Sequence, residues 1–123
     1  MILSRDSDLE LQVQLIDFKG LIIDVAQIWL TIEVKVGHSL FTAESNKPNE
    51  EDPDEPIFIN CYLDNQEHAV ICTIPEGTLE FGTTYIRCCM HEPDEHFPDG
   101  FKDVWTNWQP AGLAITTEKG INQ

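Results

Sequence analysis

Cysteine, histidine and acidic side chains are the residues of this chain best suited to chemistry, and their spacing limits what they can do together. A zinc site needs ligands that converge within about 2.3 Å of one ion. Cys88 and Cys89 are adjacent, so in a strand they point to opposite faces and cannot bind one ion together. His91 and His96 flank an acidic segment, but their spacing matches no chelating motif. The pattern favours buried free thiols and surface histidines, with no metal and no cofactor.

Calcium binding is the other chemistry that the acidic residues allow, because Ca²⁺ takes about six to eight oxygen ligands. Two acidic segments, 44–56 and 92–100, supply carboxylates, and the candidates in the second are Asp94, Glu95 and Asp99. Neither segment has the aspartate and glycine spacing of an EF-hand. Two solvated loops at one end of the fold are the simpler interpretation, and a module that binds calcium or carbohydrate is the alternative.

Catalysis requires a nucleophile beside a base, and the sequence contains none of the usual motifs for this. It has no Gly-x-Ser-x-Gly, no His-Glu-x-x-His and no phosphate-binding glycine loop. An enzyme would need a cleft that brings His91 or His96 to an acid and a nucleophile. We therefore expect a protein that is not an enzyme.

The tryptophans point to an interaction surface and not to a metal site or catalysis. Trp29 and Trp105 fall on or near polar faces of predicted strands, and exposed large apolar side chains often mark an interface. We expect these two residues to contribute to an interaction surface. The alternative is that one of them is the core tryptophan of the domain and that Trp108 covers the other sheet.

The net charge of -15, from 22 acids and 7 bases, makes contact with nucleic acid or an anionic membrane unfavourable. It keeps a small protein in solution, and it also suits a basic partner. Residues 1–16 contain no continuous apolar run, so we expect neither a signal peptide nor a transmembrane helix. These features predict synthesis in the cytoplasm with reduced thiols.

Strands must position all of these residues, because apolar side chains recur with a period of two. The first run covers residues 9–15, and the second covers residues 27–36, with Leu30 on one face and Trp29 on the other. A turn at residues 17–20, ending in glycine, separates the two runs. We expect them to form an antiparallel pair from which a β-sandwich is built.

A second hairpin is predicted from residues 57–63 and 68–74. With a two-residue loop, Cys61 lies opposite Val70 and diagonal to Cys72. Diagonal neighbours are about 7 to 8 Å apart, which is longer than most disulfides tolerate. Buried free thiols are therefore the expectation for this pair.

The whole pattern predicts about seven or eight short strands separated by turn signals, including a central strand near residues 83–91. It is typical of a single immunoglobulin-like antiparallel β-sandwich. This all-β domain is expected over residues 8–117. An N-terminal arm, 1–7, whose order depends on a neighbour, and a C-terminal tail, 118–123, flank it.

Short charged or glycine-containing segments accompany several of the predicted strands. They are Arg5-Asp6-Ser7-Asp8, Asp17-Phe18-Lys19-Gly20, Ile23-Asp24-Val25, Thr78-Leu79-Glu80-Phe81-Gly82 followed by Tyr85, and Gly112-Leu113-Ala114-Ile115. In this order they resemble the N-terminal immunoglobulin-like domain of phage baseplate upper proteins. Two threonines separate Gly82 from Tyr85, where that family has a glycine-x-tyrosine step.

The resemblance implies a virion structural protein of a tailed bacteriophage, made in the host cytoplasm. Its expected role is an assembly or adaptor module in the tail, baseplate or fibre attachment region, and a capsid decoration or head-fibre component is the alternative. The expected partners are other virion proteins, in a symmetric or multi-copy assembly, without nucleic acid or membrane.

Overall fold

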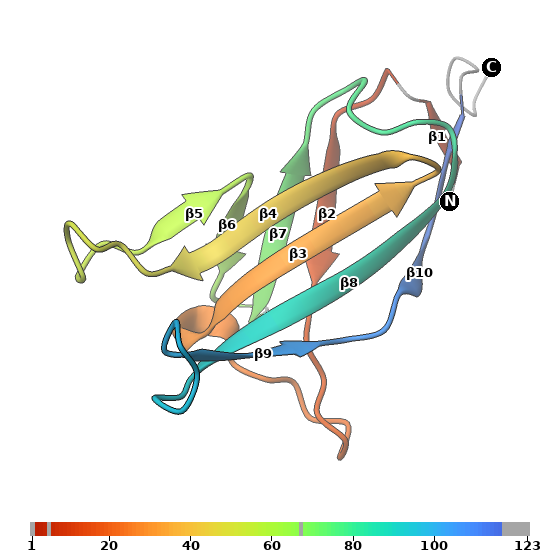
Figure 1. Cartoon of the computed structure of the whole chain (residues 1–123). Coiled ribbons are helices and arrows are strands. Elements are labelled where there is room, and N and C mark those ends of the chain that lie inside the picture. The colour runs from red at the N-terminus through yellow and green to blue at the C-terminus, as the bar shows by residue number, and fades with distance from the viewer. Residues whose placement is uncertain (1, 5, 67, 117–123) are drawn as a thin grey trace.

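Two β-sheets packed face to face make up the protein (Figure 1). The structure, a computed structural model, describes residues 2–4, 6–66 and 68–116. Its ten strands are β1 (Ile2–Ser4), β2 (Leu9–Val13), β3 (Trp29–Val36), β4 (Ser39–Lys47), β5 (Ile57–Ile59), β6 (Cys61–Asp64), β7 (Ala69–Ile74), β8 (Gly82–Pro93), β9 (Phe101–Trp105) and β10 (Gln109–Thr116). A short 3-10 helix, η1 (Val25–Gln27), precedes β3. The predicted all-β fold is confirmed.

The larger sheet has the strand order β1-β10-β8-β3-β4-β5, and β9 pairs with β8 as well. The smaller sheet has the order β2-β7-β6. The first and tenth strands run parallel, whereas the other pairs of strands are antiparallel. The long strand β8 lies inside the larger sheet, so the expectation of a central strand near residues 83–91 is confirmed. It pairs with β3 along one side, and with β10 and then β9 along the other.

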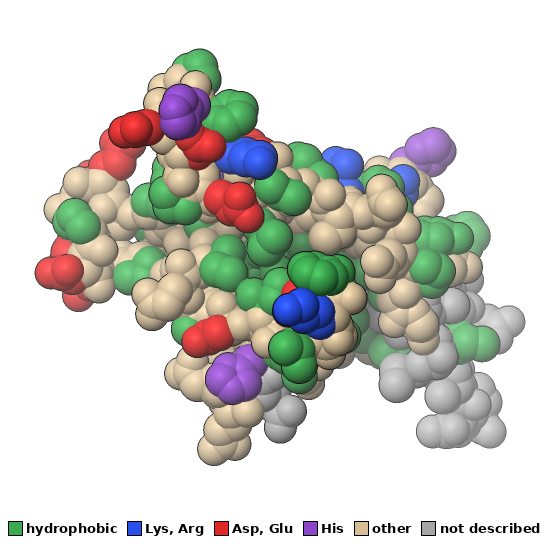
Figure 2. Space-filling view, turned by 90° about the horizontal axis from the view of Figure 1, so that it is seen from below, with side chains coloured by type: hydrophobic (Ala, Val, Ile, Leu, Met, Phe, Trp, Pro, Cys, Tyr) green, Lys and Arg blue, Asp and Glu red, His purple; other side chains and the backbone are tan. Residues whose placement is uncertain are grey.

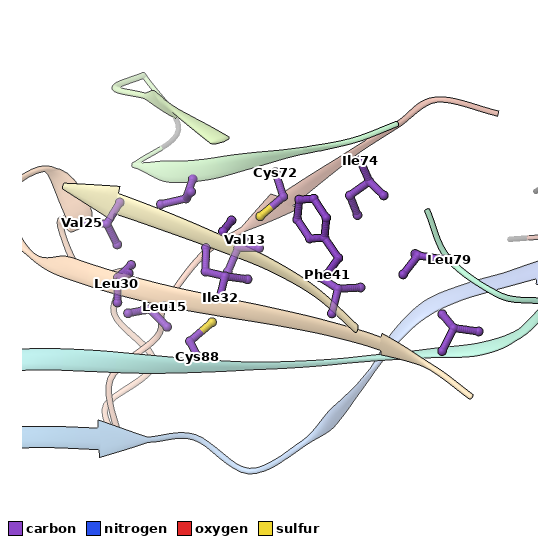
Figure 3. Packing of buried hydrophobic residues seen from close by; sticks show 14 residues of the cluster. Val13, Leu15, Val25, Leu30, Ile32, Phe41, Cys72, Ile74, Leu79 and Cys88 are labelled. Carbon is purple, nitrogen blue, oxygen red and sulfur yellow. The ribbon is translucent and has the colours of Figure 1, made fainter. Parts of the chain in front are cut away.

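The core lies between the two sheets, and β3 supplies its centre (Figure 3). Leu30, Ile32, Val34 and Val36 are all 0% exposed, so the predicted alternation of β3 is confirmed. Phe41 and Ala43 of the neighbouring strand β4 extend this side of the core, and side chains of the smaller sheet close the other side: Val13, Val70, Cys72 and Ile74. The opposite side of the larger sheet, here called the outer face, therefore carries the alternate residues of β3 and β8.

The predicted pairing of the first two runs is wrong. The turn at residues 17–20 forms, but the strands that flank it belong to different sheets, because β2 pairs with β7 while β3 pairs with β4 and β8. Between them, a single bridge joins Ile16 to Ile22. The Asp24 side chain then accepts a hydrogen bond from Ala26 N (3.0 Å) and begins η1, where Val25 is buried. This turn carries the chain from one layer to the other.

The predicted strand 57–63 is also interrupted, because Asn60 takes a left-handed conformation (φ 59°). Its side chain donates to Thr42 O of the larger sheet, whereas its carbonyl accepts from Thr73 N of the smaller sheet. Asparagine tolerates this conformation better than most residues. The chain thus changes sheet at Asn60, so β5 pairs with β4 and only β6 pairs with β7.

This change of sheet shifts the predicted hairpin register. Cys61 lies directly opposite Cys72, and Leu63, not Cys61, lies opposite Val70. All four cysteines are free thiols, as predicted. Cys88 points into the core and Cys89 lies on the outer face, so the expectation that they face opposite ways is confirmed.

Several predicted boundaries differ from the structure. The loop expected at 44–56 is shorter, because β4 continues to Lys47, and the loop expected at 92–100 begins only after Pro93. The expected arm 1–7 contains β1, which pairs with β10 of the same chain. The expected tail, 118–123, lies outside the described residues.

Replacing Ile32 with alanine tests the position of the core. Because Ile32 is fully buried at the centre of β3, we expect Ile32→Ala to lower the free energy of unfolding by about 2–5 kcal/mol, measured by urea denaturation. Leu40→Ala on β4 is the control, since this side chain is 53% exposed and its loss should cost less than about 0.5 kcal/mol. Equal losses for the two variants would place the core elsewhere.

Alkaline pH tests the burial of Cys72. Burial raises the pKa of this thiol from 9.0 to about 12, with smaller contributions from Cys61 and Cys88. The unfolded chain therefore loses this proton first, so stability should fall as the pH rises above about 9. We expect Cys72→Val to reduce the loss of unfolding free energy between pH 9 and 10.5 by about 1–2 kcal/mol.

The matched control for this measurement is Thr73→Val, on the exposed side of the same strand. It should leave the alkaline decline unchanged. A Cys72→Val protein with the same pH profile as the original chain would contradict the burial of this thiol.

Candidate functional site

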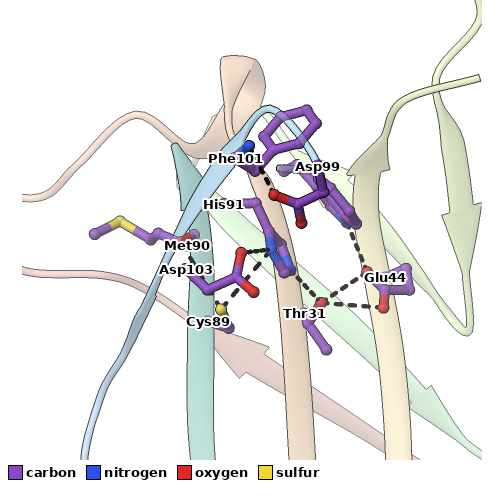
Figure 4. Close-up of polar contacts among 9 residues, drawn as sticks. Thr31, Glu44, Cys89, Met90, His91, Asp99, Phe101 and Asp103 are labelled. Carbon is purple, nitrogen blue, oxygen red and sulfur yellow. Dashed lines mark hydrogen bonds and ion pairs between the residues drawn. The ribbon is translucent and has the colours of Figure 1, made fainter. Parts of the chain in front are cut away.

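A group of hydrogen-bonded side chains lies on the outer face where β3, β4, β8 and β9 run side by side (Figure 4). This polar cluster consists of Trp29, Thr31, Glu44, His91 and Asp103. The strand registers bring it together, because His91 lies opposite both Trp29 and Asp103 while Thr31 lies opposite Glu44. Residues far apart in the sequence therefore meet at one place.

His91 stands at the centre of the polar cluster. Its Nδ1 atom lies 2.6 Å from Asp103 Oδ1, and its Nε2 atom lies 2.7 Å from Thr31 Oγ1. Thr31 Oγ1 in turn lies 2.9 and 3.0 Å from the two carboxylate oxygens of Glu44. A line of short contacts thus connects the two carboxylates through one imidazole and one hydroxyl.

The number of hydrogens decides how these contacts are made. The hydroxyl of Thr31 has one hydrogen, and a carboxylate can only accept, so this hydrogen points to Glu44. Asp103 also accepts, so its hydrogen bond with His91 needs the hydrogen on Nδ1. The polar cluster thus holds the imidazole between Asp103 on one side and Thr31, with its partner Glu44, on the other.

The Trp29 ring covers one face of His91. The Trp29 ring stacks on it with ring centroids 3.8 Å apart, and Phe101 meets Trp29 edge to face at 5.0 Å. The indole N–H of Trp29 donates to Glu44 Oε2 (2.7 Å). The His91 side chain is only 11% exposed, whereas that of Asp103 is 46% exposed. Trp29 is thus placed on the outer face, where its ring and its N–H both belong to the polar cluster.

Cys89 adds a thiol beside this group. Its sulfur lies 3.9 Å from His91 Nδ1, on the same face of β8. Burial raises the pKa of this thiol to about 11, and the nearby Asp103 carboxylate acts in the same direction. At neutral pH the thiol is therefore protonated, which makes it a poor nucleophile.

Trp105, the other predicted interaction residue, belongs to a neighbouring part of the outer face. The Arg87 guanidinium lies 4.2 Å from the centroid of the Trp105 ring and 4.7 Å from that of Trp108, and it forms an ion pair with Glu33. Lys35 lies 4.5 Å from the Trp108 ring. Trp105 is 44% exposed, so its ring stays partly open to solvent beside the arginine.

A loop of seven residues, 16–22, exposes more apolar surface than either tryptophan. This segment, here called the apolar loop, projects below the two sheets in Figure 1, and hydrophobic side chains gather on that end of the molecule in Figure 2. Four of its side chains are more than half exposed: Ile16 (62%), Phe18 (95%), Leu21 (62%) and Ile22 (51%). Large apolar side chains grouped on one exposed loop mark a contact site.

Backbone contacts give the apolar loop a defined shape. Asp17 is its anchor, because one carboxylate oxygen accepts from Lys19 N (2.8 Å) and Leu21 N (3.0 Å). The backbone of Asp17 also bonds to Gly20 and Leu21, and Gly20 supplies the positive φ of 83° that the turn needs. The four apolar side chains are thus displayed on a turn that is already ordered.

The calcium candidates Asp94 and Asp99 make hydrogen bonds within their own loop. One oxygen of Asp94 accepts from both the backbone N and the ring Nδ1 of His96, and these bonds lower the pKa of this carboxyl. Asp99 accepts from Phe101 N, and Glu95 is exposed. Among the described residues, the group of potential metal ligands that lies within 4.8 Å consists of other side chains: Cys89, His91 and Asp103. His91 and His96 each contact a different acid.

Some of these residues were not predicted as site residues. The sequence does not predict three of them, Thr31, Glu44 and Asp103, as site residues, because their proximity depends on the pairing of three different strands. In addition, Glu44 falls in a segment that the sequence predicts to be a loop. Part of the apolar loop could have been predicted from the sequence, since Leu21 and Ile22 are consecutive apolar residues. Consecutive side chains in an extended segment cannot all face one core, so part of this run had to be exposed.

Removing the hydroxyl of Thr31 tests the polar cluster. Thr31→Val leaves Glu44 and His91 without their shared partner, so we expect the free energy of unfolding to fall by about 1–3 kcal/mol in urea denaturation. Thr31→Ser keeps the hydroxyl and should lose less than half as much. Equal losses would mean that the hydroxyl contributes nothing to the cluster.

No protein-family model, curated protein or solved structure matches this chain. The resemblance to phage baseplate upper proteins therefore rests on the five sequence segments named above. Within the described part of the chain, no helix is long and apolar enough to cross a membrane.

Proposed function

We propose that this protein is a non-enzymatic assembly module that docks onto a partner protein through the apolar loop. The observation that carries the proposal is the exposure of four large apolar side chains on one ordered turn, with Phe18 almost fully exposed at 95%. Such side chains gain free energy only when a partner removes them from water, at about 25 cal/mol per Å² of apolar surface. The ordered turn reduces the entropy lost on binding.

The charge of the chain indicates the chemistry of the partner. At a net charge of -15, the protein is repelled by anionic surfaces and attracted to basic ones. Lys19 is the one basic residue in the apolar loop, and its amine lies 5.7 Å from the Phe18 ring centroid. We therefore propose a partner protein with an apolar pocket whose surroundings are basic.

The polar cluster supports a role without catalysis. In an acid-histidine-hydroxyl triad, the hydroxyl gives its hydrogen to the imidazole. Here the hydroxyl of Thr31 bonds to Glu44 as well, and a carboxylate can only accept its single hydrogen. The Cys89 thiol stays protonated at neutral pH, as its raised pKa requires. Neither group is prepared to act as a nucleophile.

We propose a tailed-phage particle as the setting, as the resemblance implies, with the protein as a multi-copy adaptor in the tail, baseplate or fibre attachment region. Gold labelling with an antibody to this chain, on particles from the producing culture, tests this location. Label on the tail or baseplate is expected, whereas label over the head would indicate a capsid decoration. Absence of label from both intact and disrupted particles would refute a place in the virion.

A variant of the apolar loop tests the docking itself. We expect Phe18→Ser with Leu21→Ser to lower the number of copies of this protein per purified particle, measured by quantitative mass spectrometry, by about tenfold or more. Both side chains are exposed, so the melting temperature should stay nearly the same.

Phe81→Ser is the matched control, because Phe81 is 65% exposed on a different loop and its replacement should not alter the copy number. A normal copy number in the Phe18 and Leu21 variant would refute docking through this loop. Binding of the original chain to lipid vesicles, lost in the same variant, would show that the apolar loop meets a membrane instead of a protein.

A further inference from the structure

Three side chains of different chemistry converge on one point of the outer face. Cys89 and His91 are two residues apart on β8 and so share a face, and Asp103 lies opposite His91 on β9. Their sulfur, nitrogen and oxygen atoms all lie within 4.8 Å of one another. From these positions we propose that Cys89, His91 and Asp103 bind a divalent transition-metal ion, with zinc as the expected ion and water as the fourth ligand.

The distances suit a tetrahedral ion. Zinc bonds of about 2.3 Å to sulfur and about 2.0 Å to nitrogen or oxygen place the ligand atoms roughly 3.3–3.6 Å apart. The sulfur of Cys89 is now 3.9 Å from His91 Nδ1, and Asp103 Oδ1 is 2.6 Å from the same nitrogen. The ion fits if the sulfur–nitrogen distance shortens slightly and the oxygen–nitrogen distance lengthens slightly. Asp103, which is partly exposed, can make this adjustment by side-chain rotation.

The surroundings of His91 hold its ring as metal sites require. A histidine ligand usually gives its other ring N–H to a polar partner, which fixes the orientation of the ring. Here the Nε2 side of His91 contacts Thr31, whose hydroxyl is held by Glu44, and Trp29 stacks on the ring. Nδ1 therefore points toward Cys89 and Asp103, as Figure 4 shows.

The choice of ligands and the charge indicate the kind of ion. Thiolate and imidazole select zinc and similar metals over magnesium and calcium, which prefer oxygen alone. On binding, the ion replaces the hydrogen of the Cys89 thiol and that of His91 Nδ1, and both protons leave to solvent. A thiolate, a carboxylate and a neutral imidazole then balance the two positive charges of the ion.

Cobalt binding tests the site, because Co²⁺ replaces zinc in tetrahedral sites and reports its ligands by absorption. The full-length protein is stripped of metal with a chelator, kept reduced, and titrated with Co²⁺ and then with Zn²⁺. We expect one ion per chain, a thiolate-to-cobalt charge-transfer band, visible bands of four-coordinate cobalt, and loss of this spectrum when Zn²⁺ is added. A spectrum without the thiolate band would overturn the proposal.

Single substitutions identify the residues that bind the ion. Cys89→Ser should remove the thiolate band, and Asp103→Asn, at a partly exposed position where folding is least disturbed, should weaken Zn²⁺ binding in a chelator competition. Thr31→Val keeps all three ligands and should weaken Zn²⁺ binding by about 10- to 100-fold. Cys61→Ala is the control, since this partly exposed thiol belongs to the other sheet and its removal should change nothing.

Thermal unfolding gives a second test of Zn²⁺ binding that does not depend on the absorption of cobalt. At a Zn²⁺ concentration that saturates the original chain, the melting temperature should rise in the original chain and in Cys61→Ala, and rise much less in Cys89→Ser and Asp103→Asn. A Co²⁺ thiolate band that persists in Cys89→Ser, or one that disappears in Cys61→Ala, would refute this set of ligands. Equal Zn²⁺ affinity in all variants would mean that the ion binds elsewhere on the surface.

Discussion

The structure depends on the alternation of β3 between a dry face and a polar face. Its inward residues, such as Ile32, are fully buried and hold the two sheets together. Its outward residues, Trp29 and Thr31, begin the polar cluster. Because a strand cannot shift by one residue without exchanging its two faces, the burial of the inner side chains also fixes the positions of the outer ones. The packing of the core and the geometry of the site are thus set by the same strand.

This dependence explains which parts of the fold the sequence could predict. Alternation is a local property, so the all-β fold, the buried face of β3 and the opposite directions of Cys88 and Cys89 follow from short windows of residues. Strand pairing is not local, and alternation does not state which strand lies next to which. The first two runs were therefore paired with each other, although they face one another across the core. The immunoglobulin-like version of the sandwich stays a prediction.

The site was less predictable than the fold, for the same reason. The sequence makes His91 a candidate for a metal or catalytic site but favours a surface histidine, because its partner Asp103 is defined only by the pairing of β8 with β9. The change of sheet at Asn60 rests on a single left-handed residue, which leaves only a weak trace in the sequence. The exposed tryptophans could be identified from their polar neighbours, whereas their contacts with His91 and Arg87 required the three-dimensional arrangement.

The parallel pairing of β1 with β10 joins segments from opposite ends of the described chain. During synthesis, Ile2–Ser4 leaves the ribosome long before its partner exists, so this edge of the larger sheet can form only after the last strand has emerged. Contacts between residues this far apart in the sequence are slow to form. The sheet is therefore completed only after β10 has emerged, and until β1 pairs with it β10 offers an open edge to any other strand that can pair there.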